Sequence, residues 1–441
     1  MDIQRNDYVE RLFAKSWNGK VKIITGIRRC GKSYLLSHLY KQFLIAKGVQ
    51  EECFVEIDLE QKANIAYRNP NTLYDYIISK CKNRRWKYYV FIDEIQRCYK
   101  VKSSDINESL VPEEDREQLY TTFYDILNGL RAQSNIDVYV TGSNSKMLSS
   151  DILTQFRDRA DEIRVFPLSF AEFYEHYEED KRGAWQDYYT YGGMPLVWTL
   201  ETHEERSSYL KNLFSQTYIK DVLERNNIRK DEEVLEILLN VLSSSVGSLT
   251  NPSKLSKTFD SERHISISPG TIDNYISFFM NAYLIDRAER YDVKGRKYIK
   301  TPLKYYFIDP GLRNARLGFR QIEETHLMEN VLYNDLLRRG YDVDVGVVEV
   351  NAKKDDGSNF RKQLEVDFVV NRGDERYYIQ SALSIDNPDK KQQEIASLIR
   401  IPDSFRKIVV VKDYMKPWRD DKGIQYVGVE QFLLDEDFLS R

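Results

Sequence analysis

The stretch Gly26-Ile27-Arg28-Arg29-Cys30-Gly31-Lys32-Ser33 fits the pattern G-x-x-x-x-G-K-[ST] at every fixed position. In such a loop, glycines let backbone N–H groups curl around a phosphate chain, a lysine reaches the outer phosphates, and a hydroxyl binds Mg²⁺. The apolar run Val21–Thr25 comes before the loop, and apolar residues at helical spacing over Ser33–Lys47 follow it. Strand, loop and helix in this order are the context that the pattern requires, which disfavours a chance glycine turn. We therefore predict a phosphate-binding loop.

A nucleotide in this loop would contact the loop itself and the residue after it. Lys32 is predicted to neutralise the outer phosphates, and Ser33 is predicted to bind Mg²⁺. The N-terminus of the following helix adds a dipole that favours an anion. The predicted nucleotide-binding residues are Gly26, Ile27, Arg28, Arg29, Cys30, Gly31, Lys32, Ser33 and Tyr34.

A second apolar run, Tyr88–Ile92, ends in the two carboxylates Asp93 and Glu94. Alone, the pair could be two solvated acids at the end of a strand. Beside a phosphate loop, we predict that Asp93 holds Mg²⁺ together with Ser33, and that Glu94 orients and deprotonates an attacking water. A strand-like stretch, Cys53–Leu59, lies between the two motifs, so we expect Asp93 on a strand that is not adjacent to the strand of the loop.

Polar residues also follow the strand-like run Asp137–Thr141. Ser143 and Asn144 could sense the outermost phosphate or position water, or one of them could cap a helix at 145–156. Arg157 and Arg159 come after that helix, and a phosphate-contacting arginine that reaches a neighbouring subunit would come from this region. A solvated arginine is the alternative, and the sequence leaves both pairs of interpretations open.

Strand-like and helix-like stretches alternate over residues 1–168, which predicts an α/β fold with a parallel sheet. A helical region is predicted over 169–235, and a winged helix over 236–320, because helices at 268–280 precede strands at 284–291 and 298–308. Residues 321–441 return to an α/β pattern. Two polar stretches, 99–118 and 351–363, are predicted to be surface loops. The basic turn with Lys294, Arg296 and Lys297 either contacts DNA or is a solvated tip.

Composition excludes several classes of protein. The chain has 441 residues with 65 Lys plus Arg and 69 Asp plus Glu, so its net charge of −4 excludes a basic coat over the whole surface. The N-terminal residues lack the apolar core of a secretory signal, and no apolar run is long enough to span a membrane. The four cysteines form no C-x-x-C pair, and this spacing indicates free thiols in a reducing compartment. We expect a cytoplasmic protein without a membrane partner.

Taken together, these motifs resemble prokaryotic AAA-type P-loop ATPases that carry a C-terminal restriction-endonuclease-like domain of unassigned function. The resemblance covers nearly the whole chain and rests on residues 24–33, Phe91-Ile92-Asp93-Glu94-Ile95-Gln96, Thr141-Gly142-Ser143-Asn144-Ser145, 166–173, Tyr191-Gly192-Gly193-Met194-Pro195 and 365–369. It implies an AAA-like core at 1–168, a helical lid at 169–235, a winged helix at 236–320 and a nuclease-like domain at 321–441. Where the family has Gly-Arg, this chain has Asp158-Arg159. The resemblance therefore makes Arg159 the candidate for the arginine that contacts phosphate in a neighbouring subunit.

In the C-terminal region, Glu329 and Asp367 resemble the acids of a restriction-endonuclease site. Such a site also needs an acid and a lysine, spaced E-x-K, on the next strand, because the acids gather Mg²⁺ and the lysine supports the attacking water. Here Gln380 stands at the position of the acid and Ala382 at that of the lysine. We predict a degenerate nuclease-like site.

These residues predict an ATP-binding protein that hydrolyses ATP with Mg²⁺ and acts as a switch or motor on an unknown partner. Two alternatives remain at this level. One is a nuclease gated by ATP, and the other is a nucleotide-dependent regulator that binds DNA through the winged helix. ATP is preferred over GTP because no guanine-specific N-K-x-D stretch follows a predicted strand. An oligomer is expected if Arg159 completes a neighbour's site.

Overall fold

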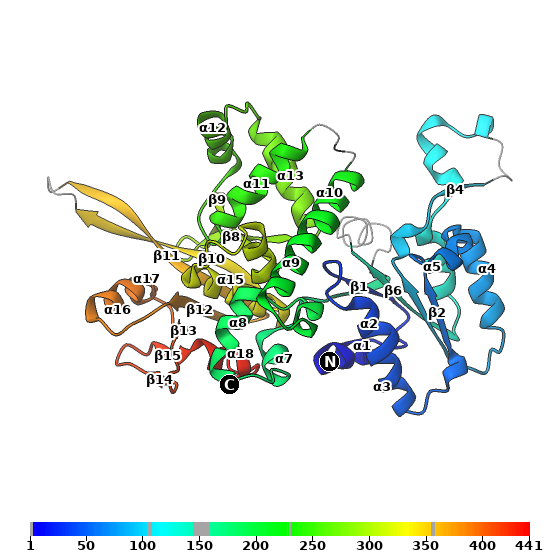
Figure 1. Ribbon diagram of the computed structural model, residues 1–441, viewed down its shortest axis with the longest axis horizontal. Helices are drawn as coiled ribbons and strands as arrows, with labels where there is room; N and C mark the ends of the chain where they lie inside the picture. Colours follow the sequence, from blue (N-terminus) through cyan, green and yellow to red (C-terminus); the bar gives the residue numbers. More distant parts are fainter. Residues whose placement is uncertain (1–2, 104–107, 144–157, 227, 229–230, 354–357) are drawn as a thin grey trace. The chain divides into compact units, whose positions relative to one another are not determined.

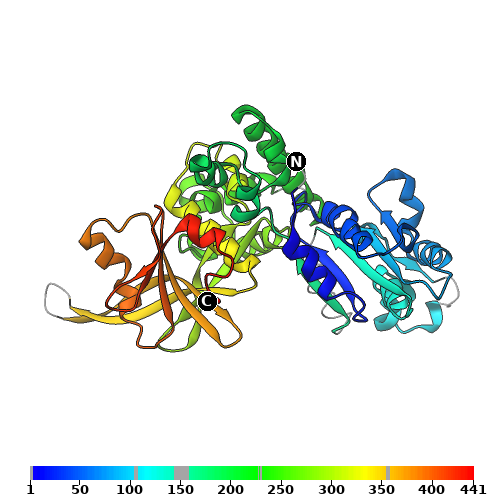
Figure 2. The same ribbon diagram turned by 90° about the horizontal axis from the view of Figure 1, so that it is seen from below.

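The computed structural model describes residues 3–103, 108–143, 158–226, 228, 231–353 and 358–441 (Figures 1 and 2). The chain forms two compact units, Met1–Phe166 and Pro167–Arg441. The boundary between the units falls close to residue 168, where the first predicted domain ends. The four predicted domain ranges are not tested by this division and stay predictions.

Within the described residues, the first unit is built on a five-stranded sheet whose strands are all parallel (Figure 1). Its strands are β1 (Val21–Thr25), β2 (Phe54–Asp58), β3 (Tyr88–Asp93), β6 (Ile136–Gly142) and β7 (Ala160–Arg164). They lie in the order β2-β3-β6-β1-β7. The predicted P-loop α/β fold is confirmed, and Asp93 lies on a strand that is not adjacent to β1. The strand between them is β6, while β2 lies at the edge of the sheet.

Helices cover both faces of this sheet. Helices α4 (Pro70–Lys80) and α5 (Phe123–Arg131) bury their apolar residues in one core with the side chains of β3 and β6. On the other face, the helix after the loop runs from α2 (Lys32–Tyr34) through a π-helical segment, η1 (Leu35–Tyr40), into α3 (Lys41–Ala46). Its Tyr40 ring packs against Tyr139 of β6 at 5.3 Å between centroids, and α1 (Asn6–Ala14) contacts α3 through Phe13 and Phe43.

The polar stretch 99–118 is only partly the loop that the sequence predicts. It contains β4 (Val101–Lys102), which pairs with β5 (Tyr120–Thr121) in a small antiparallel sheet. Helix α5 follows β5 and begins at Phe123. The reason is local, because Thr122 and Asp125 form a capping box that fixes the helix start.

A buried ion pair lies between two neighbouring strands of the five-stranded sheet. Lys22 of β1 and Asp137 of β6 have side chains that are 0% and 4% exposed, and the Lys22 ammonium donates to the Asp137 carboxylate. The second Asp137 oxygen accepts from the backbone N–H of Trp17 at 2.9 Å and from the Tyr139 hydroxyl at 2.8 Å. Burial lowers the pKa of Lys22, although Asp137 opposes the shift. The pair therefore couples β1 to β6, the two strands on which the predicted site depends.

The second unit begins with helices. They are α7 (Phe170–Glu175), α8 (Ala184–Tyr191), α9 (His203–Asn212), α10 (Lys220–Arg225), α11 (Glu232–Ser244), α12 (Pro252–Arg263), α13 (Pro269–Asn281), α14 (Pro310–Arg316) and α15 (Glu324–Arg338). The Ser169–Glu172 capping box starts α7, and the N–H of Gly193 donates to the Asp309 carboxylate at 2.6 Å. These contacts give a structural role to two of the stretches that carry the resemblance, at 166–173 and 191–195.

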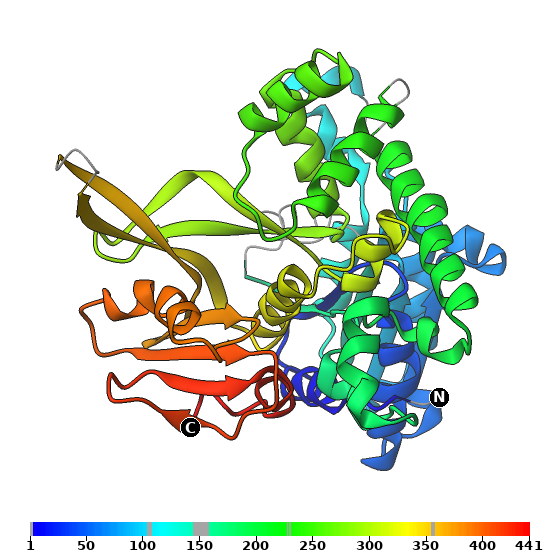
Figure 3. The ribbon, with the colours of Figure 1, turned by 60° about the vertical axis from the view of Figure 1, so that its left-hand side comes forward.

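The described second unit also contains a mixed sheet of eight strands (Figure 3) and the C-terminal helix α18 (Val429–Leu434). The strands are β8 (Ile285–Asp292), β9 (Lys297–Phe307), β10 (Asp342–Lys353), β11 (Asn359–Arg372), β12 (Glu375–Ala382), β13 (Arg406–Val411), β14 (Trp418–Arg419) and β15 (Gln425–Gly428). Their order is β14-β15-β13-β12-β11-β10-β8-β9. Helix α15 packs on one face through Tyr333 and Phe368, and α16 (Pro388–Glu394) leads into α17 (Ala396–Ile399) on the other.

Two features of this sheet differ from the predictions. The charged stretch 351–363, predicted to be a loop, is largely strand, because β10 continues to Lys353 and β11 starts at Asn359. Alternation could not reveal this hairpin, since most of its described side chains are exposed on both faces. The helices and hairpin predicted for the winged helix are present in order, but β8 pairs in parallel with β10, so the hairpin belongs to the larger sheet. The winged-helix assignment stays a prediction.

We predict that Lys22→Met lowers the free energy of unfolding by about 3 to 5 kcal/mol, because it leaves the Asp137 carboxylate buried without its cation. The matched control is Lys20→Met, since Lys20 pairs with Asp158 at 2.8 Å but the Asp158 side chain is 91% exposed. This control should change stability little. Chemical denaturation of the full chain measures both, and equal losses in the two variants would contradict a stabilising buried pair.

Candidate active site

The phosphate loop leaves β1 at Gly26, a position that only glycine can occupy. Its φ is 140°, and a Cβ built there would lie 2.2 Å from the carbonyl oxygen of Val165. Gly31 also has a positive φ, of 98°, and so does Arg29, at 63°. The thiol of Cys30 is buried and donates to the same Val165 oxygen at 3.5 Å. The loop is thus packed tightly against the residues that follow β7, which fixes its backbone.

The Lys32 side chain lies inside the loop. The residue is 4% exposed, and its Nζ donates to the carbonyl oxygens of Gly26 and Ile27 at 2.9 Å each. The loop therefore holds a buried cation at the N-terminus of α2. A phosphate chain in the loop would meet this charge together with the dipole of the helix.

Asp93 lies beside the loop, as predicted, and is held by two hydroxyl groups. The Ser33 Oγ donates to the Asp93 carboxylate, with distances of 2.9 and 2.8 Å to its two oxygens. The Thr141 hydroxyl of β6 donates to the first of these oxygens. Burial raises the pKa of Asp93, although the hydrogen bonds from Thr141 and Ser33 oppose the shift. Ser33 and Asp93 thus offer a hydroxyl and a carboxylate side by side, which are oxygen ligands of the kind that Mg²⁺ prefers.

Glu94 follows at a sharp turn of the backbone. Its φ is 54°, in the left-handed region, and its N–H donates to the Thr141 Oγ at 3.0 Å. Its carboxylate accepts from the Gln96 amide and, at 3.3 Å, from the Ser143 hydroxyl. The residue is 7% exposed, and burial raises its pKa, although the Lys32 charge opposes the shift. The turn, together with Ser143 and Gln96, fixes the Glu94 carboxylate next to the predicted metal ligands.

Three residues of this site were not predicted. Thr141 bonds both Asp93 and Glu94, and Gln96 bonds Glu94, although both lie within stretches that carry the resemblance. Arg5 is 4% exposed and donates to the carbonyl oxygens of Cys30, at 3.3 Å, and Phe166, at 3.0 Å. Thr141 could have been found from its place at the end of a buried strand. Arg5 carries no sequence signal, because it reaches the loop from the start of the chain.

Among the other predicted loop residues, Ile27 is buried, whereas Arg28, Arg29 and Tyr34 lie nearer the surface. Arg28 pairs with Glu60 at 2.8 Å, and Arg97 pairs with the same Glu60 oxygen at 2.8 Å. Tyr34 is 43% exposed and stacks on His38 at 4.7 Å between ring centroids. These side chains lie on the surface of the loop and its helix.

The predicted residues beyond β6 are only partly described. Ser143 contacts Glu94, whereas Asn144, the helix predicted at 145–156 and Arg157 lie outside the described residues. Arg159 is exposed, and its carbonyl oxygen accepts from the N–H of Val21, the first residue of β1. The phosphate loop follows the last residue of β1, whereas Arg159 contacts the first residue. Arg159 therefore lies at the opposite end of the parallel strands from the loop. Within one chain it does not belong to the site.

In the second unit, the predicted nuclease-like residues come together, but with an unexpected lysine. Lys304 of β9 is 3% exposed, and its Nζ lies 2.8 Å from an oxygen of Glu329 and 2.7 Å from one of Glu365. The Tyr306 hydroxyl donates to the same Glu329 oxygen at 2.5 Å. Burial opposes the charge of Lys304, but Glu329, Asp367 and Glu365 outweigh it and raise the lysine's pKa. A cation of the chain itself thus occupies the space between these carboxylates.

Asp367 and Gln380 are also satisfied from within the chain. Asp367 is 7% exposed and accepts from the N–H of Ser381 at 2.8 Å. Burial raises its pKa well above the ordinary value, Glu329 adds to this shift and Lys304 opposes it. The Gln380 Oε1 accepts from the N–H of Asp367 at 3.4 Å. Ala382 is buried on β12 and offers no polar group.

We predict that Lys304→Met lowers the free energy of unfolding by about 3 to 5 kcal/mol near neutral pH, because Glu329 and Glu365 lose their shared cation. Lys304 opposes the raised pKa of Asp367, so removing this positive charge raises the pKa of Asp367 in the folded state further. The folded state then binds protons more tightly than the unfolded one, so the loss should shrink as the pH is lowered. Denaturation across a pH series measures this, with the exposed Lys390→Met as control. A loss that is independent of pH would contradict the ion cluster.

Among the described residues, no group of three or more His, Cys, Asp or Glu side chains has the arrangement of a metal site. Mg²⁺ at the phosphate loop would therefore rely on Ser33 and Asp93 together with substrate phosphates and water, as is common for this ion. Within the described part of the chain, no helix is both long and apolar enough to cross a membrane.

Comparison with known proteins places these features in a family. An AAA domain model matches residues 18–174, and a Domain of unknown function (DUF8612) matches residues 182–323. An uncharacterized protein of Haemophilus influenzae is 30% identical over 437 residues, which are 98% of each chain. The uncharacterized protein MJ1544 of Methanocaldococcus jannaschii is 27% identical over 390 residues, covering 85% of this chain and 77% of the relative.

Among solved structures, the Aeropyrum pernix ORC1 protein in complex with DNA is 10% identical, with 72% of this chain and 92% of that chain covered. Its TM-score is 0.29. The chain belongs to the protein family of the uncharacterized Haemophilus influenzae protein, and its first unit contains an AAA domain of the P-loop type.

Proposed function

We propose that the chain binds ATP and hydrolyses its β–γ phosphate bond with Mg²⁺, and that this reaction drives a switch or motor acting on a partner. The single observation that carries the proposal is the hydrogen-bonded group of Ser33, Asp93, Thr141 and Glu94 beside the phosphate loop. An anion-binding loop alone would account for binding. A fixed carboxylate next to a pair of metal ligands accounts for hydrolysis.

The roles follow from the geometry. Lys32 exchanges its bonds to the loop carbonyl oxygens for bonds to phosphate oxygens and neutralises charge that develops on them. Ser33 and Asp93 hold Mg²⁺, which polarises the phosphates when it is bound. Glu94, kept in place by Ser143 and Gln96, orients a water and accepts its proton. The raised pKa of Glu94 makes its carboxylate a stronger base.

The C-terminal region is proposed to have a nuclease-like fold without hydrolytic activity. The observation that favours this reading over an ATP-gated nuclease is the position of Lys304, whose ammonium fills the carboxylate cluster that a metal ion would need. Gln380 and Ala382 supply neither the third acid nor the lysine of an E-x-K pair. A DNA-binding regulator acting through the predicted winged helix remains the second candidate function, and the basic turn around Arg296 favours it.

We predict different effects for two variants of the phosphate site. Lys32→Ala abolishes ATP binding, because Lys32 contacts phosphates of the bound ground state. Glu94→Gln binds ATP normally but hydrolyses it about 10² to 10⁴ times more slowly, because its carboxylate acts only on the attacking water. Equilibrium binding and phosphate release, with GTP as competitor, measure both. The control is Glu52→Gln, an exposed acid before β2. Wild-type turnover in Glu94→Gln would show that another group is the base.

We also predict that hydrolysis depends on assembly. Arg159 lies beside the first residue of β1, at the end of the strands opposite the phosphate loop of its own chain. It could therefore reach phosphates only in a neighbouring copy. An arginine of this kind contributes about 10³ to 10⁵ in rate. Arg159→Ala and Glu94→Gln should each be inactive alone, whereas their mixture should regain activity, because an intact Arg159 from one variant completes the intact site of the other. A mixture as inactive as its components would exclude a shared site.

A further inference from the structure

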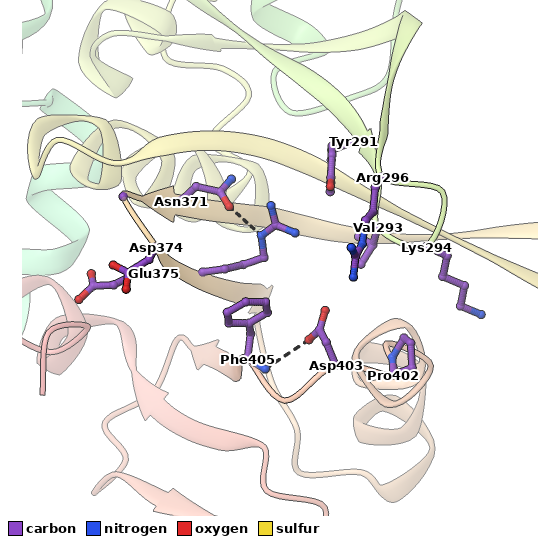
Figure 4. A pocket seen from close by; sticks show the side chains of 12 residues that line it. Tyr291, Val293, Lys294, Arg296, Asn371, Asp374, Glu375, Pro402, Asp403 and Phe405 are labelled. Atoms are coloured by element: carbon purple, nitrogen blue, oxygen red, sulfur yellow. Dashed lines mark hydrogen bonds between the residues drawn. The ribbon is translucent and has the colours of Figure 1, made fainter.

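A pocket of about 620 Å³ lies at one end of the sheet in the second unit (Figure 4). Three turns of the chain meet there. They are the β8–β9 turn with Arg296, the β11–β12 turn between Asn371 and Arg376, and the loop that leads into β13 with Asp403 and Phe405. The volume is that of a pocket for a small organic ligand. Neither the phosphate site nor the carboxylate cluster uses any of these residues.

Each of the three turns is fixed by its own hydrogen bonds. In the first, the Asp292 carboxylate accepts from the N–H of Gly295 at 2.9 Å, and the N–H of Arg296 donates to the Asp292 carbonyl oxygen at 2.7 Å. This turn holds Arg296 in a left-handed conformation with φ of 52°. A Cβ at position 295 would lie 2.2 Å from the Asp292 carboxylate, so a larger residue there would have to displace the carboxylate that accepts from its N–H. Arg296 is thus presented on a rigid tip.

The other two turns are equally tied. The Asp403 carboxylate accepts from the Tyr378 hydroxyl at 2.6 Å and from the N–H of Phe405 at 3.3 Å. The Arg376 Nε donates to the Asn371 side-chain oxygen at 2.7 Å. The walls of the pocket are therefore preorganised, which limits the entropy lost when a ligand binds.

The chemistry of the walls combines cations with aromatic rings. The Arg376 guanidinium lies 5.1 Å from the ring centroid of Tyr291 and 5.8 Å from that of Phe405. Figure 4 shows Arg296 and Phe405 at the border of the same space, and Arg376 is a further residue of the pocket lining. In the described residues neither arginine pairs with a carboxylate, whereas Asp403 is engaged by Tyr378 and Glu375 pairs with Arg372 at 3.3 Å. Phe405 is 41% exposed, so its ring face is open beside the two arginines, and the acid Asp374 also lines the pocket.

We propose that this pocket binds a nucleotide unit, with the base stacked on Phe405 and the phosphate bound by Arg296 and Arg376. Aromatic rings provide a stacking surface for any base, and guanidinium groups match the geometry of phosphate. Two sources can supply this unit, a free nucleotide or an unpaired nucleotide of a nucleic-acid strand. The proposal does not depend on ATP hydrolysis, because the pocket shares no residue with the phosphate loop.

The test uses the full chain carrying Lys32→Ala, so that the phosphate loop does not contribute. The probes are AMP, by calorimetry, and fluorescent oligothymidylate, by anisotropy over a salt series. Phe405→Ala should weaken binding about 10- to 100-fold through lost stacking. Arg296→Ala should weaken it too and, for the oligonucleotide, reduce the slope of log affinity against log salt by about 0.7. The control Arg287→Ala removes an exposed arginine of β8 that pairs with Glu289 and should change neither value.

The outcomes separate the two sources. Affinity for AMP alone, lost in Phe405→Ala, identifies a free-nucleotide site, and affinity for the oligonucleotide alone, lost in the same variant, identifies a strand site. Absence of binding by both probes overturns the proposal. So does binding that Phe405→Ala and Arg296→Ala leave at the level of Arg287→Ala, because the ligand would then lie elsewhere. Thermal unfolding of each variant checks that the sheet remains intact.

Discussion

The Asp93 carboxylate, held between the hydroxyl groups of Ser33 and Thr141, is the interaction on which the candidate active site depends. It joins three elements that are distant in sequence, namely the helix after the phosphate loop, the end of β3 and the end of β6. Because Thr141 also accepts the N–H of Glu94, the same hydroxyl sets the turn that aims the predicted base. The parallel order of the sheet is what brings these three chain segments to one edge.

The interior of the first unit contains a buried ion pair between β1 and β6, at a place where apolar side chains would be easier to bury. Lys22 and Asp137 lie on adjacent strands that must stay in register for Thr141 to meet Asp93. A buried pair contributes little to stability compared with packed apolar residues, but it penalises every register that separates the two charges. Asp137 also accepts from the Tyr139 hydroxyl of β6 and from the N–H of Trp17, and the second bond ties the segment before β1 to the same carboxylate. The ion pair thus fixes the relative position of the loop and Thr141.

The sequence predicts the parts of the site that are local and omits those that depend on distant pairing. The loop, Asp93, Glu94 and Ser143 follow strands whose apolar runs are plain, so their meeting at one edge could be predicted. Arg5 contacts the loop across a long stretch of chain and belongs to no motif. Lys304 was missed for the same reason, because its strand joins the C-terminal sheet only through the parallel pairing of β8 with β10. The charged hairpin of β10 and β11 was hidden because its exposed strands lack an apolar face.

In the carboxylate cluster of the second unit, a lysine of the chain itself pairs with acidic side chains. Acids that share a buried space repel one another unless a cation is present. Burial raises the pKa of Asp367, and the neighbouring Glu329 charge raises it further. Lys304 supplies a cation from within the chain, and the Tyr306 hydroxyl donates a second hydrogen bond to the same Glu329 oxygen. Because Lys304 supplies the positive charge of this cluster, the cluster contains a cation although Gln380 and Ala382 carry no charge. Glu329 and Glu365 are ion-pair partners of Lys304, so the presence of these acids alone is not evidence of catalysis.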